Sequence, residues 1–179
     1  MIDLYTWSTP NGRKVSIALE ELELPYTVHA VNISKDEQFD PEFLKHSPNN
    51  KIPAIFDQKT GQSLMESGAI LICLAEQTGQ LLPSAGEARS KVLEWLMWQM
   101  GGLGPICGQG HHFLKYNPGK SAYAEQRFGA EIQRLYGVLD RQLAENAYLA
   151  GAQYSIADIA SWPWVSRFEW HQADLHSFP

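Results

Sequence analysis

The N-terminal part of the chain switches between strand-like and helix-like spacing of its apolar residues. Apolar and polar side chains alternate over residues 2–6, which predicts a short strand. Thr9 and Pro10 then suit the N-cap and first position of a helix that ends at Pro25. Residues 26–33 alternate again and predict a second strand, which a right-handed crossover would place parallel to the first.

The following residues predict a short helix, two further strands and a second long helix. One or two helical turns are expected at 40–44, and strands at 52–56 and 63–65, with a turn between the strands. A serine and an apolar run predict a helix from Ser67. Because the order βαβ, α, ββ, α is that of thioredoxins, we expect residues 1–82 to form an α/β, thioredoxin-like domain.

The pattern changes after residues 83–86, whose composition is that of a linker. Residues 87–179 carry long apolar stripes at helical spacing and no convincing strand. We therefore expect an all-α, C-terminal helical bundle over 87–179. Within it, Ser155 and Asp158 have the spacing of a capping box and predict the start of one helix.

Charge and composition narrow the classes of partner. The 179 residues include 14 Lys or Arg and 20 Asp or Glu, so the formal net charge is −6. Without a cluster of basic residues, neither nucleic acid nor an anionic membrane is an expected partner. The chain starts with no leader-like pattern and has no apolar run of about 18 residues, so a cytoplasmic location is expected.

The cysteines and histidines predict neither a disulfide framework nor a metal site. Cys73 and Cys107 are too few and too far apart for either a framework or a thiolate cluster. Cys73 lies in an apolar run and is expected to be a buried, inert thiol. His111 and His112 are neighbours, which on a helix point about 100° apart, so a structural or pocket-wall role is expected.

Three short motifs fall at the loop ends of the expected sheet: residues 9–12 (TPNG), 49–53 (NNKIP) and 66–70 (ESGAI). In these motifs the chain resembles the cytosolic glutathione transferases, and most of all the bacterial nu-class glutathione-dependent disulfide-bond oxidoreductases. The resemblance extends over essentially the whole chain and includes residues 98–105 and 111–113. It implies reduced or oxidised glutathione as cosubstrate, no metal, and a homodimer.

Two of the motifs suggest how a tripeptide would bind. An X-Pro bond adopts the cis form at a cost of only about 0.5–1 kcal/mol, and a cis Ile52–Pro53 bond would leave the Ile52 backbone to pair with an extended peptide. An ordinary trans proline at a strand start is the alternative. Glu66 and Ser67, at a helix N-terminus, suit the ammonium and carboxylate of a γ-glutamyl group, or else form a plain cap.

The resemblance adds three more binding residues. Gln38 and Lys51 match family positions that contact the tripeptide, and Lys51 would pair with its glycine carboxylate. Arg127 matches a nu-class arginine that reaches glutathione from the partner subunit, and a guanidinium suits a carboxylate through paired donors. Arg134 is close enough in sequence that the choice between the two arginines stays open.

Thr9 and Asn11 match the turn where thioredoxins place their reactive cysteine. Since this chain has no cysteine there, the reactive sulfur is expected to be that of the ligand. Lowering a thiol pKa by two units takes about 2.7 kcal/mol, which a helix N-terminus and hydrogen bonds can supply. Thr9 and Asn11 are the expected catalytic residues, with Tyr5 and Ser8 as alternatives.

The resemblance and these residues are compatible with three alternative functions. The leading one is a disulfide-bond oxidoreductase in which a bound glutathione thiolate attacks a small disulfide and a second glutathione resolves the product. The second is a transferase that conjugates the same thiolate to an electrophile, and the third is a non-catalytic binding or regulatory protein. Relatives usually continue past Pro179, so residues 162–168 are expected to be partly exposed if the chain is a fragment.

Overall fold

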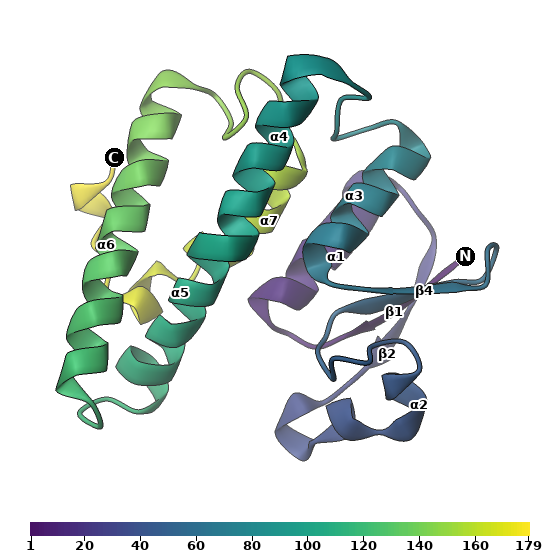
Figure 1. Cartoon of the computed structure of the whole chain (residues 1–179), viewed down its shortest axis with the longest axis horizontal. Helices are drawn as coiled ribbons and strands as arrows, with labels where there is room; N and C mark the ends of the chain where they lie inside the picture. The colour runs from purple at the N-terminus through teal and green to yellow at the C-terminus, as the bar shows by residue number, and fades with distance from the viewer. The chain divides into compact units, whose positions relative to one another are not determined.

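The computed structural model describes all residues from Met1 to Pro179, in two compact units, Met1–Ser84 and Ala85–Pro179 (Figure 1). The first unit has the predicted order of elements and is thioredoxin-like. Its elements are β1 (Ile2–Thr6), α1 (Pro10–Glu21), β2 (Tyr26–Ala30), the 3-10 turns η1 (Ile33–Lys35) and η2 (Glu37–Phe39), α2 (Pro41–Leu44), β3 (Ala54–Asp57), β4 (Gln62–Met65) and α3 (Ser67–Thr78).

The four strands form one sheet in the order β2-β1-β3-β4. The β1 and β2 strands are parallel, as predicted, while β3 is antiparallel to both of its neighbours. The second strand ends at Ala30, three residues earlier than expected, because Asn32 starts a turn: its side-chain oxygen accepts from the Ser34 N–H at 3.0 Å. Such a local hydrogen bond competes with strand pairing.

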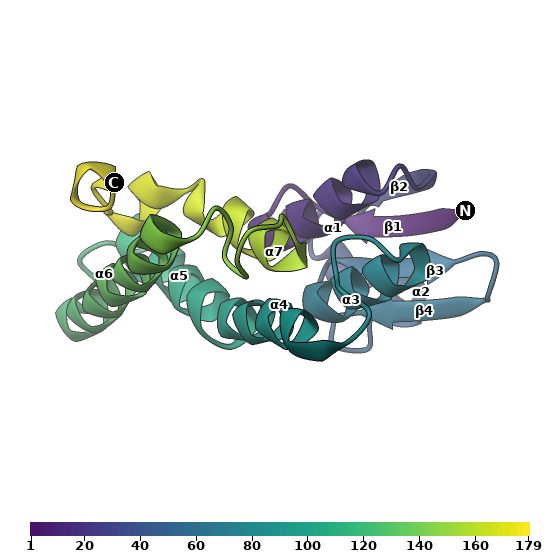
Figure 2. The ribbon, with the colours of Figure 1, turned by 90° about the horizontal axis from the view of Figure 1, so that it is seen from above.

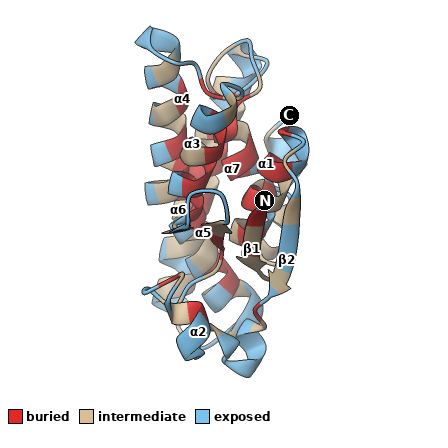
Figure 3. Ribbon diagram, turned by 90° about the vertical axis from the view of Figure 1, so that its right-hand side faces the viewer, coloured by how far each residue is buried: buried red, intermediate tan, exposed pale blue.

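The two faces of the sheet have different covers. Leu4 and Tyr5 are neighbours on β1 and therefore point to opposite faces. Tyr5 packs on a small buried cluster that includes Phe43 of α2, so α2 covers that face. Leu4 is fully buried on the face covered by α1 and α3, which lie side by side in two views (Figures 1 and 2). The edge strand β2 is largely exposed (Figure 3).

The second unit contains helices and one isolated β-bridge, in agreement with the predicted all-α bundle. Its elements are α4 (Gly86–Trp98), the π-helical turn η3 (Gln99–Leu103), α5 (Gly104–Gly110), the π-helical turn η4 (His111–Tyr116), α6 (Ala122–Glu145), α7 (Ile156–Val165) and the 3-10 turns η5 (Phe168–His171) and η6 (Leu175–Ser177). The stretch from α4 to η4 is thus a single helical run interrupted by two wide turns.

The predicted capping box at the start of α7 is present. The Ser155 hydroxyl accepts from the Ala157 N–H at 3.3 Å, and Asp158 accepts from the Ser155 N–H at 2.9 Å. The same carboxylate also accepts from the Leu149 N–H at 2.8 Å. Asp158 therefore ties the loop before α7 to the helix itself.

A buried cluster of aromatic rings fills part of the second unit. His111 and His171 stack with their ring centres 4.8 Å apart, and the Tyr136 hydroxyl hydrogen-bonds to His171 Nδ1 at 2.9 Å. Burial lowers the pKa of His111 to about 4 and that of His171 to about 3, so both rings are neutral at pH 7. His111 has the structural role that was expected, as part of the core.

Candidate functional site

The predicted binding segments of the first unit meet at one end of the sheet. Tyr5, near the end of β1, pairs with Ala54 at the start of β3, and Ala54 also pairs with Met65 at the end of β4. The residues that follow β1, precede β3 and follow β4 are therefore neighbours in space. These are the segments 9–12, 49–53 and 66–70, which lie far apart in the sequence.

Thr9 is the N-cap of α1, and its hydroxyl oxygen accepts from the Gly12 N–H at 3.1 Å. The hydroxyl keeps its own proton to donate, since a serine or threonine oxygen can accept and donate together. Asn11 is the second residue of the helix and is half-buried. A Cβ on Gly12 would overlap the Trp7 carbonyl oxygen and the Thr6 hydroxyl, so this turn is closely packed.

The peptide bond between Ile52 and Pro53 is cis, as predicted. The turn before it is held by Ser47, whose hydroxyl donates to the Lys51 carbonyl oxygen at 2.7 Å and accepts from the Lys51 N–H at 3.3 Å. The Lys51 side chain is exposed, and the Ile52 backbone lies outside the ladder of β3. Backbone groups of Ile52 are therefore not used by the sheet.

Glu66 and Ser67 stand at the N-terminus of α3, but their local roles differ from the expected serine cap. Glu66 is the N-cap, with φ 70° and ψ 112° and without a side-chain cap, while Ser67 is the first helical residue. A positive φ is unusual for glutamate and marks a constrained position. Ser67 is 3% exposed, and Lys14 of α1 donates to its hydroxyl oxygen at 3.5 Å.

Gln38 lies in η2, beyond the end of β2. Its Nε2 donates to an Asp36 carboxylate oxygen at 3.3 Å, while its Oε1 is buried and accepts no hydrogen bond. A buried amide oxygen without a hydrogen bond can accept one from an N–H or O–H group of a ligand.

The two candidate arginines belong to α6 of the second unit and border one hollow of about 770 Å³. Arg134 donates to both carboxylate oxygens of Glu131, from Nε at 2.8 Å and from Nη2 at 2.7 Å. Arg127 is exposed and makes no such pair. The structure thus separates two residues that the sequence left equivalent.

Neither cysteine is a reactive thiol. Cys107 is fully buried, and burial raises its pKa to about 12. Cys73 is half-buried, whereas we expected a buried residue, and burial raises its pKa as well. Because the thiolate is the nucleophilic form, both side chains are poor candidates for sulfur chemistry.

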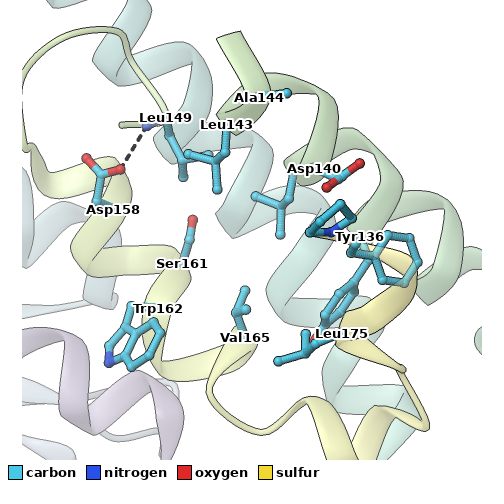
Figure 4. A pocket seen from close by; sticks show the side chains of 13 residues that line it. Tyr136, Asp140, Leu143, Ala144, Leu149, Asp158, Ser161, Trp162, Val165 and Leu175 are labelled. Carbon is cyan, nitrogen blue, oxygen red and sulfur yellow. Dashed lines mark hydrogen bonds between the residues drawn. The ribbon is translucent and has the colours of Figure 1, made fainter. Parts of the chain in front are cut away.

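The second unit also holds an apolar cavity of about 430 Å³ between α6, α7 and the last residues of the chain (Figure 4). Asp140 and Leu143 approach it from α6, and Ser161 and Trp162 from α7. Trp162 is 63% exposed, whereas Trp164 is buried, so only part of the segment 162–168 is exposed. None of the predicted binding residues lines this cavity.

Comparison with protein families covers both units. Residues 9–77 match the model described as the N-terminal domain of glutathione S-transferase, and residues 122–177 match the model of its C-terminal domain. The chain belongs to the glutathione S-transferase family.

No helix of this family member has both the length and the apolar character that a membrane crossing needs. No group of three or more His, Cys, Asp or Glu side chains could hold a metal.

Several relatives of this family member are similar over most of its length. It is 50% identical to the disulfide-bond oxidoreductase YfcG of Escherichia coli K12, over 100% of this chain and 86% of YfcG. A Pseudomonas fluorescens Pf-5 family member with two glutathione molecules bound has a TM-score of 0.93 at 45% identity, over 99% of this chain and 83% of the other. A Pseudomonas putida glutathione transferase with one glutathione disulfide bound per subunit has a TM-score of 0.89 at 47% identity, over 96% and 77%.

One residue that contacts a predicted site residue, Ser67, was missed from the sequence. Lys14 follows Pro10 by four residues and precedes Ala18 and Leu22 at the same spacing, and all four positions are buried. A lysine within the apolar stripe of a helix is the signal that could have identified it.

Proposed function

We propose that this chain is a glutathione-dependent disulfide-bond oxidoreductase of the nu class that uses the thiolate of bound glutathione instead of a protein cysteine. The observation that carries the proposal is the meeting of segments 9–12, 49–53 and 66–70 at one end of a thioredoxin-like sheet that offers no thiol there. The relatives named as a disulfide-bond oxidoreductase and as a complex with glutathione disulfide support it.

In this proposal Thr9 and Asn11 hold the glutathione sulfur as a thiolate at the N-terminus of α1. The Thr9 hydroxyl donates its remaining proton to the sulfur while its oxygen caps the helix. A helix N-terminus supplies up to about 2 kcal/mol, and each hydrogen bond to a charged group about 1.5–3 kcal/mol. Together they exceed the roughly 2.7 kcal/mol needed to lower a thiol pKa by two units.

The rest of the tripeptide would extend along the same end of the sheet. The Ile52 backbone, beside Pro53, pairs with the central peptide, and Lys51 with the glycine carboxylate. Glu66 and Ser67 take the γ-glutamyl ammonium and carboxylate, and the Gln38 amide oxygen accepts a ligand N–H. In a homodimer, Arg127 of one subunit would reach the tripeptide bound to the other.

The reaction is two successive thiol–disulfide exchanges on a small disulfide RSSR. The first glutathione thiolate forms a bond to one sulfur of RSSR, the S–S bond breaks, and RS⁻ leaves. A second glutathione thiolate then attacks the glutathione sulfur of the mixed disulfide, releasing the second RS⁻ and forming glutathione disulfide. The two glutathione molecules supply the two electrons, and the protein supplies position and charge stabilisation.

The test compares the Asn11→Ala and Thr9→Ala variants with wild type, using glutathione and 2-hydroxyethyl disulfide. Loss of one hydrogen bond to the thiolate should lower kcat about tenfold or more and change glutathione binding less. Ser16→Ala, on the same helix, is the matched control, and Cys73→Ser should retain full activity. Unchanged turnover in both site variants would refute the proposed mechanism.

A second substrate separates the proposal from its alternatives. Initial rates with 1-chloro-2,4-dinitrobenzene should be low relative to those with the disulfide, and a strong preference for the aromatic electrophile would favour a conjugating transferase instead. Calorimetric binding of glutathione without turnover of either substrate would favour a binding protein. Light scattering of the purified chain tests the homodimer.

A further inference from the structure

Lys14 is a charged residue in a position where lysine is rarely found. It lies one turn into α1, it is 1% exposed, and its buried neighbours along the helix are apolar. Lysine side chains are almost never fully buried unless they are paired, because removing an ammonium from water is costly. The position therefore calls for a reason other than packing.

The ammonium group lies at the N-terminus of the neighbouring helix. Lys14 Nζ is 3.5 Å from the Ser67 hydroxyl oxygen, and Ser67 is the first residue of α3. The two helices pack against each other, so this contact connects the start of α3 to the turn that carries Thr9 and Asn11. Lys14 thus connects the second turn of α1 to the N-terminus of α3.

Two effects act on the pKa of Lys14 in opposite directions. Burial lowers its pKa to about 7, and the negative charge of Glu66, at the N-cap of α3, acts against this effect. Further along α3, the titratable groups are Cys73 and Glu76. With a pKa near neutrality, the side chain changes its charge within the physiological pH range.

We propose that Lys14 is a positioning residue of the glutathione site, whose ammonium group donates to the Ser67 hydroxyl oxygen and so directs the Ser67 hydroxyl proton toward the γ-glutamyl carboxylate. This inference rests on the function proposed above. An ammonium group has three donors and no acceptor, so Ser67 Oγ must act as the acceptor toward it. The Ser67 O–H then points away from Lys14 and is directed to an incoming anion.

Deprotonation reverses this arrangement. A neutral amine carries a lone pair and can accept the Ser67 hydroxyl proton, which takes that donor from the carboxylate. The positive charge near the carboxylate is lost in the same step. Carboxylate binding and protonation of Lys14 should therefore favour each other, as linkage requires.

The experiment is calorimetric titration of the full chain with S-methylglutathione, which has no thiol to titrate. It is run at pH 6.5 and 8.5 in two buffers of different ionisation enthalpy, so that proton uptake is measured together with Kd. For wild type we expect Kd to rise about tenfold between pH 6.5 and 8.5, which by linkage corresponds to an average uptake of about half a proton per site over this interval. A pH-independent Kd without proton uptake would overturn the role of Lys14.

Variants separate a positioning role from a merely structural one. Lys14→Met keeps the length of the side chain and should bind about tenfold more weakly at pH 6.5, with no proton uptake at pH 8.5. Lys45→Met, which removes an exposed lysine paired with Glu42, should keep the wild-type profile. A Lys14→Met variant that retains the wild-type pH dependence would refute the inference.

The outcomes also distinguish this inference from the proposed function. If wild type binds S-methylglutathione with a flat pH profile, the role of Lys14 fails and the proposed function stands. If wild type does not bind the ligand at pH 6.5, the proposed function fails and the inference fails with it.

Discussion

Replacing Lys14 with methionine should stabilise the first unit, and by an amount that depends on pH. The pKa of Lys14 is lowered from 10.5 to about 7, chiefly by burial. One pKa unit corresponds to about 1.4 kcal/mol, so at pH 6 the buried ammonium destabilises the folded chain by about 5 kcal/mol. Methionine fills a similar volume without a charge, so the variant avoids this cost.

The pH dependence follows from proton binding. Between pH 7 and 10.5 the unfolded chain holds a proton on Lys14 that the folded chain does not, so the free energy of unfolding of wild type increases as pH rises through this window. The advantage of Lys14→Met should therefore fall from about 5 kcal/mol at pH 6 to about 3 at pH 8.5 and about 1 at pH 10. Loss of the neutral hydrogen bond to Ser67, about 1 kcal/mol, would bring the difference near zero at pH 10.

Urea unfolding followed by far-ultraviolet circular dichroism at pH 6, 8.5 and 10 measures these differences. Lys45→Met is the control for loss of a lysine at the surface, where the ion pair with Glu42 is worth little. A difference between Lys14→Met and wild type that is the same at pH 6 and pH 10, or a variant less stable than wild type at pH 6, would refute the reasoning.

Four further predictions concern both units. Gly12→Ala should lower the free energy of unfolding by about 1–3 kcal/mol and remove most of the disulfide reductase activity, since its Cβ would overlap Trp7 and Thr6. The control Gly129→Ala, which has open space around it, should be neutral or stabilising in the same urea assay. Asp158→Ala should cost about 2–3 kcal/mol in urea unfolding by leaving the Leu149 and Ser155 N–H groups unpaired, with unchanged glutathione affinity of the folded chain. Arg127→Ala should raise the KM for glutathione about tenfold, and Arg134→Ala less than twofold, because Glu131 already occupies Arg134. Burial lowers the pKa values of His111 and His171, so as pH falls below about 6.5 the unfolded chain takes up two protons that the folded chain does not. The free energy of unfolding should therefore drop by about 2.4 kcal/mol between pH 6 and 5, and a drop of less than half this size would contradict the prediction.

The order of elements could be predicted because local patterns determine it. The alternation in β1 and the cap at Thr9 are short-range signals, and the capping box at Ser155 and Asp158 is another. The parallel pairing of β1 with β2 followed from the handedness of the crossover. The alternation and the two caps depend on residues within a few positions of one another.

Other features depend on the contacts of individual side chains, which the pattern of apolar positions does not encode. Lys14 contacts Ser67 across 53 positions, and no local pattern says that a lysine will be enclosed beside a helix terminus. The difference between Arg127 and Arg134 depended on which of them pairs with Glu131, a carboxylate four residues from one and three from the other. The early end of β2 depended on a hydrogen bond of the Asn32 side chain, which an alternation of apolar and polar residues does not reveal.

The two π-helical turns set the rotational phase of the long helical run in the second unit. Val92, Leu96, Gln99, Leu103, Cys107 and His111 are all buried, at intervals of three or four residues that average 3.8. A regular α-helix with 3.6 residues per turn would let such a stripe drift around its surface, whereas a wider turn absorbs the surplus. Deleting Gly101 would therefore rotate everything downstream by about 100°, turning Cys107 and His111 out toward water.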